Sequence, residues 1–429
     1  MEPSDVQHRV TRQYEEFPYP ERDPRDEERR LIGTWLDDIG LINHHCFRGE
    51  RRFESGFRVL VAGGGTGDGT IFLAEQLRGT NARIVHLDVS EASIAIARER
   101  ARIRGLSEIE WIAGSIIDLP KWALGEFNYI NCVGVLHHLD SPERGLDALL
   151  SALAPDGALG LMVYGQIGRT GVYQLQSLLR TLNTGLDNTA AKLINAKSVL
   201  ASLPRRNWFK RGEELHPDHH SGGDAGIVDL LLHPRDRAYT VPQLYEWLED
   251  RCGLHIAFTD VHRGRLPYSP QRILSSAEPG LLERLGALPQ RDRETIAELA
   301  GGDLITHSFY ATRLKDSRAP YGDRAYIPFF ITEECPARGE ELAALIEHHK
   351  REPFLLQHGQ SGLALPITCG QYCRQIFSHL NGERSWHQIF ERVRAGMALD
   401  QPSDATLFDD FRPWFDALTL IDRMLLRRY

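Results

Sequence analysis

The sequence predicts an α/β fold: a doubly wound parallel sheet with an inserted cap and a mostly helical C-terminal module. From residue 57 onward, short apolar runs alternate with segments of helical periodicity, and a cluster of glycines directly follows the first run. Buried strands separated by helices of about 10–15 residues are typical of such a sheet. The alternation stops after residue 164, which predicts the cap.

The first five strands and the helices between them follow in order along residues 57–164. Strands are expected at "RVLVA" (58–62), "RIVHL" (83–87), "IEWIAG" (109–114), "FNYINCVGVL" (127–136) and "GALGLMVY" (157–164). Helices are expected at "GTIFLAEQL" (69–77), "SEASIAIARERARI" (90–103) and "SPERGLDALLSAL" (141–153). Later in the chain, "LHIAFTDV" (254–261) and "THSFYATRL" (306–314) read as the last strands, with helical segments at 240–253 and 278–299.

These elements divide the chain into five predicted parts. They are an N-terminal arm or lid (1–48), the first part of the sheet domain (49–164), a cap insertion (165–239), the last strands (240–316) and a C-terminal helical or winged-helix-like module (317–429). The insertion is rich in Gly, Arg, Asn and His. We expect it to cover the ligand-binding end of the sheet, because long loops at that end usually build the site.

The composition predicts a soluble, globular protein of two or three domains. The chain has 429 residues, of which 42% are hydrophobic and 25% charged. No apolar run approaches the roughly 18 residues of a membrane span, and the N-terminus lacks the layout of a signal peptide. We therefore expect a cytoplasmic protein with no membrane partner. The formal net charge of -9 argues against a dedicated nucleic-acid binder.

The glycine cluster "VLVAGGGTGDGT" (59–70) fits neither common phosphate-binding loop. The dinucleotide fingerprint needs a sixth-position glycine, but a frame starting at Gly63 reaches Asp68 and one starting at Gly65 reaches Thr70. The P-loop needs a terminal Lys followed by Ser or Thr, and the cluster has neither. What does fit is a buried strand followed by a tight turn that leaves room for a ligand on the backbone.

Asp88 indicates what kind of ligand this is. It ends the second strand, "RIVHLD", and a carboxylate at that position can accept hydrogen bonds from both hydroxyls of a ribose. Alternatively, Asp88 caps the helix that follows, although Ser90 could serve as that cap instead. The position favours a nucleoside-containing ligand.

The ordered segments "VLVAGGGTG", "IVHLDVSEASIAIAR", "IAGSIIDLP", "FNYINCVGVLHHL" and "LAPDGALGLMVY" resemble the class I S-adenosylmethionine-dependent methyltransferases. The resemblance covers about 57–165 and resumes at about 240–314. It implies a Rossmann-like methyltransferase sheet, S-adenosyl-L-methionine as cofactor with S-adenosyl-L-homocysteine as product, and methyl transfer to a small molecule or a protein side chain. The flanking "QYEEFPYP" (13–20) resembles one bacterial subgroup, some of whose members carry tetratricopeptide repeats; no such repeats are visible here.

The resemblance also implies a set of cofactor-binding residues at the ends of four strands. They are Gly63, Gly64, Gly65, Gly67, Asp68, Asp88, Val89, Ser115, Ile116, Asn131, Cys132 and Val135. The glycines would approach the methionine part, Asp88 the ribose and the segment from Ser115 the adenine. Two positions depart from the family pattern, because Val61 and Ser115 stand where acids are common. Either the backbone and Asp68 meet the cofactor's amines, or the site is weakened.

Candidates for catalysis and substrate binding surround these strand ends. His137 and His138 sit just past the fourth strand, where a general base would belong, although either could instead pack against the cofactor or the cap. Tyr14, also a catalytic candidate, would belong to an aromatic lid. Tyr19, Arg169 and Tyr173 are the candidates for substrate binding or for steadying the lid.

Other interpretations stay open from the sequence alone. The departures at Val61 and Ser115 would also suit a cofactor-binding regulator without catalysis, and an NAD-dependent oxidoreductase is a weaker alternative. The segment "ELHPDHH" (214–220) matches no closed zinc pattern, so we expect no metal. The C-terminal module would serve as a structural or dimerising domain, which allows a homodimer, or would recognise a protein substrate.

Overall fold

The computed structural model describes residues 5–54, 56–259, 266–350, 352–358, 363–397 and 401–429. The chain forms two compact units. Unit 1 comprises Met1–Asp37, Phe53–Phe258 and Pro267–Arg313; unit 2 comprises Asp38–Arg52, Thr259–Leu266 and Leu314–Tyr429. No helix among the described residues is both long and apolar enough to span a bilayer.

Unit 1 is built on the predicted α/β sheet, in the order β3-β2-β1-β4-β5-β8-β7, with β6 pairing β5. The strands are β1 (Arg58–Ala62), β2 (Arg83–Asp88), β3 (Ile109–Ala113), β4 (Phe127–Val133), β5 (Leu153–Gly165), β6 (Ala238–Tyr239), β7 (His255–Phe258) and β8 (Thr306–Thr312). The sheet is parallel from β3 to β5, as predicted. β8, however, runs antiparallel to both β5 and β7, a direction that an apolar run cannot reveal. Residues 260 and 261, expected in the same strand as β7, lie outside the described residues.

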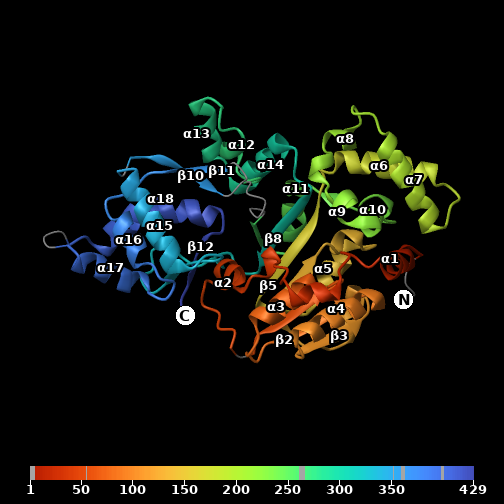
Figure 1. Ribbon diagram of the computed structural model, residues 1–429, viewed down its shortest axis with the longest axis horizontal. Coiled ribbons are helices and arrows are strands. Elements are labelled where there is room, and N and C mark those ends of the chain that lie inside the picture. Colours follow the sequence, from red (N-terminus) through yellow and green to blue (C-terminus); the bar gives the residue numbers. More distant parts are fainter. Residues whose placement is uncertain (1–4, 55, 260–265, 351, 359–362, 398–400) are drawn as a thin grey trace. The chain divides into compact units, whose positions relative to one another are not determined.

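Helices cover the sheet of unit 1 (Figure 1). They are α1 (Asp5–Glu16), η1 (Pro24–Glu28), η2 (Trp35–Asp37), α3 (Asp68–Gln76), α4 (Glu91–Arg104), η3 (Ile116–Lys121), η4 (Leu136–His138), α5 (Pro142–Ser151), α11 (Val241–Leu244), the π-helical turn η6 (Tyr245–Asp250), α12 (Pro270–Ile273), α13 (Pro279–Ala287) and α14 (Gln290–Gly301). The two ends of α4 follow ordinary capping chemistry. Ser90 begins α4 by accepting a hydrogen bond from the Ser93 amide at 3.0 Å, and Gly105 ends it with a φ of 66°.

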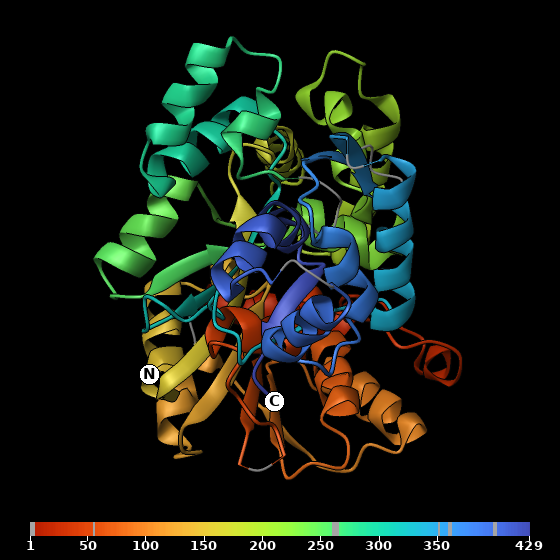
Figure 2. The same cartoon turned by 90° about the vertical axis from the view of Figure 1, so that its left-hand side faces the viewer.

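Most of the residues predicted to form the cap (165–239) form helices that share an apolar core. The helices of the cap are α6 (Thr170–Leu182), α7 (Thr189–Ser202), α8 (Trp208–Arg211), η5 (Glu213–Leu215), α9 (Asp218–Ser221) and α10 (Gly223–Leu232). Val172, Leu175, Phe209 and Val228 are among the buried residues that hold these helices together. In both views the yellow-green helices gather into one group (Figure 2). This core includes residues of α10, so α10 is packed against the other helices of the cap.

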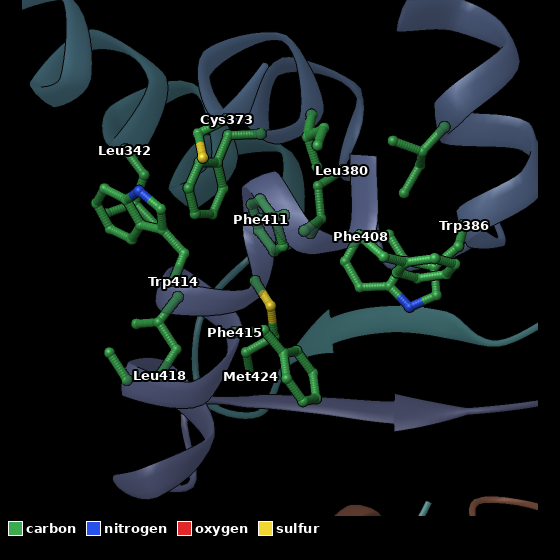
Figure 3. Packing of buried hydrophobic residues seen from close by; sticks show 14 of the residues in the cluster. Leu342, Cys373, Leu380, Trp386, Phe408, Phe411, Trp414, Phe415, Leu418 and Met424 are labelled. Carbon is green, nitrogen blue, oxygen red and sulfur yellow. The ribbon is translucent and has the colours of Figure 1, made fainter. Parts of the chain in front are cut away.

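Unit 2 is mostly helical, as predicted for the C-terminal module. It contains α2 (Ile39–Cys46), β9 (Ile327–Phe330), α15 (Cys335–His348), β10 (Phe354–His358), β11 (Leu363–Ile367), α16 (Cys373–His379), α17 (Trp386–Ala395), α18 (Asp404–Leu420) and β12 (Met424–Arg427). Its core is aromatic: Trp386, Phe411 and Trp414 are fully buried within it (Figure 3). Helix α2, from the N-terminal part of the sequence, also belongs to this unit.

Candidate active site

The glycine loop after β1 makes a turn that side chains would obstruct. Gly63 and Gly65 have φ values of 76° and 52°, in the region that favours glycine. A Cβ atom at Gly63 would lie 2.3 Å from a methyl group of Val135, which follows β4. The loop therefore packs directly against the segment that leads to His137 and His138.

Asp88 ends β2 and is held by the backbone around it. Its Oδ2 accepts a hydrogen bond from the Gly65 amide at 2.8 Å, and its Oδ1 accepts one from the Ser90 amide at 2.9 Å. Burial raises the pKa of Asp88, although these amides work against the rise. A carboxylate has about four acceptor sites, and the amides of Gly65, Val89 and Ser90 hydrogen-bond to this one. Acceptor capacity therefore remains for a ribose hydroxyl. Ser90 caps α4, so Asp88 is not needed as the cap.

The other predicted cofactor residues lie at the ends of neighbouring strands. Ser115 begins η3 after β3, accepting from the Ile117 amide at 3.3 Å, and Ile116 is buried beside it. Asn131 and Cys132 are buried on β4, and burial raises the pKa of the Cys132 thiol to about 12. Since β3, β2, β1 and β4 are adjacent, the sheet brings the predicted residues together at one edge.

Asn131 contacts a buried acid, Asp37, that was not predicted from the sequence. Its side-chain amide donates to Asp37 Oδ1 at 2.6 Å, and the Thr34 hydroxyl donates to Asp37 Oδ2 at 2.7 Å. A Cβ atom at Gly69 would lie 2.7 Å from the same carboxylate. Asn131 is the register partner of Val61 on β1. A carboxylate from η2 therefore stands next to the strand end that lacks the family's usual acid.

Asp68 is held by two arginines. Arg22 contacts it through both Nε and Nη2, the latter at 2.6 Å, and Arg100 contacts it at 2.7 Å. Burial alone would raise the pKa of Asp68, but hydrogen bonds and charge from these guanidinium groups lower it. The carboxylate is thus engaged in binding α4 and the arm, and its expected contact with the cofactor's amines stays a prediction.

The N-terminal arm crosses from the start of α4 to the glycine loop. The Tyr14 carbonyl accepts a hydrogen bond from Ser90 Oγ at 3.1 Å, and the Pro20 carbonyl accepts one from Thr66 Oγ1 at 2.7 Å. A Cβ atom at Gly65 would lie 2.8 Å from the Tyr19 carbonyl oxygen. The arm therefore lies against the same loop and strand end that hold the predicted cofactor residues.

Tyr14 also joins a buried cluster of acid–base side chains. A ring nitrogen of His138, an oxygen of Asp229 and a ring nitrogen of His233 lie within 4.8 Å of one another. The Tyr14 hydroxyl donates to Asp229 Oδ1 at 3.0 Å and lies 3.4 Å from His233 Nε2. We call His138, Asp229 and His233, with Tyr14 and Tyr164, the histidine–aspartate cluster.

The two predicted histidines of η4 differ in their surroundings. Neither ring nitrogen of His137 has a hydrogen-bond partner among the residues that the structure describes, and burial holds the pKa of His137 well below the ordinary value. His137 packs against the ring of Tyr164, with centroids 3.9 Å apart. His138, by contrast, has its Nδ1 2.8 Å from the Arg235 carbonyl oxygen. Because a carbonyl only accepts, His138 Nδ1 carries the proton and Nε2 keeps a lone pair.

Arg169 and Tyr173 are engaged mainly within the cap. Arg169 Nη2 lies 2.8 Å from Asp236, and the Tyr173 hydroxyl donates to the same carboxylate at 3.0 Å. The Arg169 guanidinium also lies 3.6 Å from the ring centre of Tyr164, which brings it to the edge of the cluster. Tyr19 is mostly buried, and burial raises its pKa. Their predicted contacts with substrate are not tested by this arrangement.

The residues missed from the sequence come from segments remote from the strand motifs. Asp229 and His233 lie on or next to α10. The expectation that the cap covers the ligand-binding end of the sheet does not say which of the cap's side chains lie near that end. Within the described residues, a second group of metal-ligand type, Glu213, His219 and His220, coincides with the histidine-rich loop. His220 in that group is exposed, so the group has the character of a surface cluster.

Parts of the chain are similar to known proteins. Residues 59–157 match the family model described as "Methyltransferase domain". An uncharacterised protein of Synechococcus sp. is 33% identical over 260 residues, 60% of this chain and 60% of that protein. The mitochondrial ubiquinone biosynthesis O-methyltransferase of Schizosaccharomyces pombe is 28% identical over 207 residues, 43% of this chain and 71% of that protein. The chain thus spans about three-fifths of the Synechococcus relative.

A solved structure shares the fold. PKMT2 from Rickettsia typhi, determined in complex with AdoHcy, matches with a TM-score of 0.62 at 14% identity, over 92% of this chain and 76% of that one. Residues 59–157 are thus similar to a methyltransferase domain, and the chain shares the fold of PKMT2.

Proposed function

We propose that the protein is an active methyltransferase that methylates an oxygen or nitrogen nucleophile of a small molecule or a protein side chain. The observation that supports it best is the position of the histidine–aspartate cluster. His138 lies three residues after Val135, which packs on the glycine loop. The Tyr14 carbonyl accepts a hydrogen bond from Ser90, two residues after Asp88. Acid–base groups thus stand directly beside the residues proposed for the cofactor, where a general base would be needed.

The cofactor would be held by the glycine loop, Asp88, the start of η3 and Asn131. The fit rests on two observations: the loop has space only for glycine at position 63, and Asp88 retains acceptor capacity at the strand end. When bound, S-adenosylmethionine supplies a sulfonium-activated methyl group and becomes a neutral thioether. The protein's own task is to align the acceptor and to exclude water.

His138 is the residue we assign to receive the acceptor's proton. Its Nδ1–H is fixed by the Arg235 carbonyl, which leaves the Nε2 lone pair as the proton acceptor. Burial lowers the pKa of His137 and of His233 well below the ordinary value, which makes each a poor base. A base of this kind typically contributes a factor of about 10²–10⁴ to the rate. An acceptor that arrives as O–H or N–H would find its proton acceptor in place.

Labelled methyl transfer tests the proposal. The protein is incubated with methyl-labelled S-adenosylmethionine and an extract of cells lacking its gene, and the products are separated into large and small molecules. We expect label in one fraction, lost when excess S-adenosylhomocysteine is added. Label in the large fraction would indicate a protein acceptor, and label in the small fraction a metabolite. Tight S-adenosylhomocysteine binding with no label in either fraction would contradict the proposed function.

A further inference from the structure

We propose that Asp229, a carboxylate of cap helix α10, is the counter-ion of a protonated His138, so that the cap supplies the positioning half of an acid–base pair. This inference rests on the proposed function, because it concerns the fate of the acceptor's proton. It gives the cap insertion a part in the reaction, beyond covering the sheet. Asp229 is then a positioning residue that acts through His138.

Burial raises the pKa of the Asp229 carboxyl, and the charge of His138 and the hydrogen bond from Tyr14 offset part of that rise. Tyr14 donates to its Oδ1 at 3.0 Å and Tyr164 donates to its Oδ2 at 3.3 Å. Asp229 is only 6% exposed, and among the described residues it forms no ion pair with Lys or Arg. A buried charge without a cationic partner is costly. Two phenol donors reduce that cost, and a positive charge within 4.8 Å on His138 would remove most of the rest.

The direction of the hydrogen bonds distinguishes the two histidines beside Asp229. The Arg235 amide donates to His233 Nδ1 at 3.1 Å, so neutral His233 carries its proton on Nε2 and presents a donor toward Tyr14. His138 has the opposite arrangement, with the proton on Nδ1 and a lone pair on Nε2. Only His138 can therefore take up a proton without losing an existing hydrogen bond. The same reasoning disfavours a metal, because His233 Nε2 has no lone pair to offer.

The charges balance across the transfer. The acceptor's O–H or N–H bond breaks and its proton forms a new N–H bond on His138 Nε2. The positive charge that the sulfonium loses thus reappears on the imidazolium of His138. Asp229 stabilises that charge where burial weakens screening by water. Without Asp229, a buried imidazolium would be unpaired and the proton would transfer less readily.

Nuclear magnetic resonance of ring-¹⁵N-histidine-labelled full-length protein bound to S-adenosylhomocysteine tests the inference without a known acceptor. The His138 signals are assigned by their loss in His138→Gln. We expect the Nδ1–H tautomer at high pH.

In Asp229→Asn the titration midpoint of His138 should move to lower pH by about one unit or more, the usual effect of removing an opposite charge at this range. The groups that face His138 and are held constant are His137, His233, Tyr14, Tyr164, Arg169, Arg235, Asp140 and Asp236.

Asp224→Asn is the matched control, because Asp224 lies on the same helix but is exposed and pairs with Lys197. It should leave the midpoint unchanged. If Asp229→Asn does not fold, Tyr164→Phe provides the measurement: with one donor removed, the carboxylate should attract the proton more strongly and the midpoint should rise. An unchanged midpoint in the folded Asp229→Asn protein, or a stoichiometric metal in the purified wild type that Asp229→Asn loses, would overturn the inference. If the midpoint of His138 shifts as expected but no methyl transfer is detected, the proposed function is refuted and the inference about Asp229 stands.

Discussion

An Arg100→Met variant is expected to lose about 3–5 kcal/mol of unfolding free energy, the usual consequence of removing one partner from a buried ion pair. Arg100 is 1% exposed and lies 2.7 Å from both Glu27 and Asp68, and it also donates to the Thr66 carbonyl. The Glu27 side chain is equally buried and, within the described part of the chain, would keep only Arg104 as an ion-pair partner. Methionine retains much of the side-chain volume, so the loss reports the charge rather than a cavity.

Urea unfolding followed by circular dichroism measures this loss as a lower transition midpoint. Arg102→Met is the matched control, since Arg102 lies on the same helix but is 70% exposed and pairs with Glu99. Such a surface pair contributes at most about 1 kcal/mol. Equal midpoints for the two variants would show that the network of Arg100 does not hold the arm and α4 together.

A His138→Gln variant is expected to transfer methyl groups about 10²–10⁴ times more slowly, while its affinity for S-adenosylhomocysteine stays near that of the wild type. Glutamine can still donate to the Arg235 carbonyl, but it cannot take up a proton as the imidazole lone pair does. The rate is measured with labelled cofactor and the extract fraction that receives label. A loss of rate without a loss of affinity separates proton transfer from cofactor binding.

His220→Gln serves as the control for this substitution, because His220 lies in the cap but its side chain is 69% exposed. Its rate should match the wild type. A His138→Gln variant as fast as the His220→Gln variant would remove His138 from the mechanism. The acceptor would then be a nucleophile that arrives already deprotonated.

The sheet domain could be predicted from the sequence because its signals are local. Each strand is an apolar run, and the glycine loop and Asp88 lie next to strand ends, where the fold requires them. Ser90 has the form of a helix cap and is one. The direction of β8 and the π-helical turn at Tyr245–Asp250 had no such local signal. Both features depend on packing against elements that are distant in the sequence.

The acid–base half of the site depends on contacts between residues far apart in the sequence. His138 could be picked out because it follows β4, and Tyr14 because of its aromatic neighbours. Asp229 could not, because its partners Tyr14 and Tyr164 are 215 and 65 residues away. Asp37 was missed for the same reason: it meets Asn131 across 94 residues. The sequence locates such acids only when the fold is known.

Equilibrium titration of the full-length protein with S-adenosylhomocysteine tests the cofactor site most directly. We expect the wild type to bind. Asp88→Ala should bind more weakly by about 1–3 kcal/mol, the cost of lost hydrogen bonds to a buried polar partner, or roughly 5- to 150-fold. Glu110→Ala, which removes an exposed carboxylate from neighbouring β3, should leave the affinity unchanged. A wild type that does not bind S-adenosylhomocysteine, or an Asp88→Ala variant that binds it equally well, would contradict the site described for this chain.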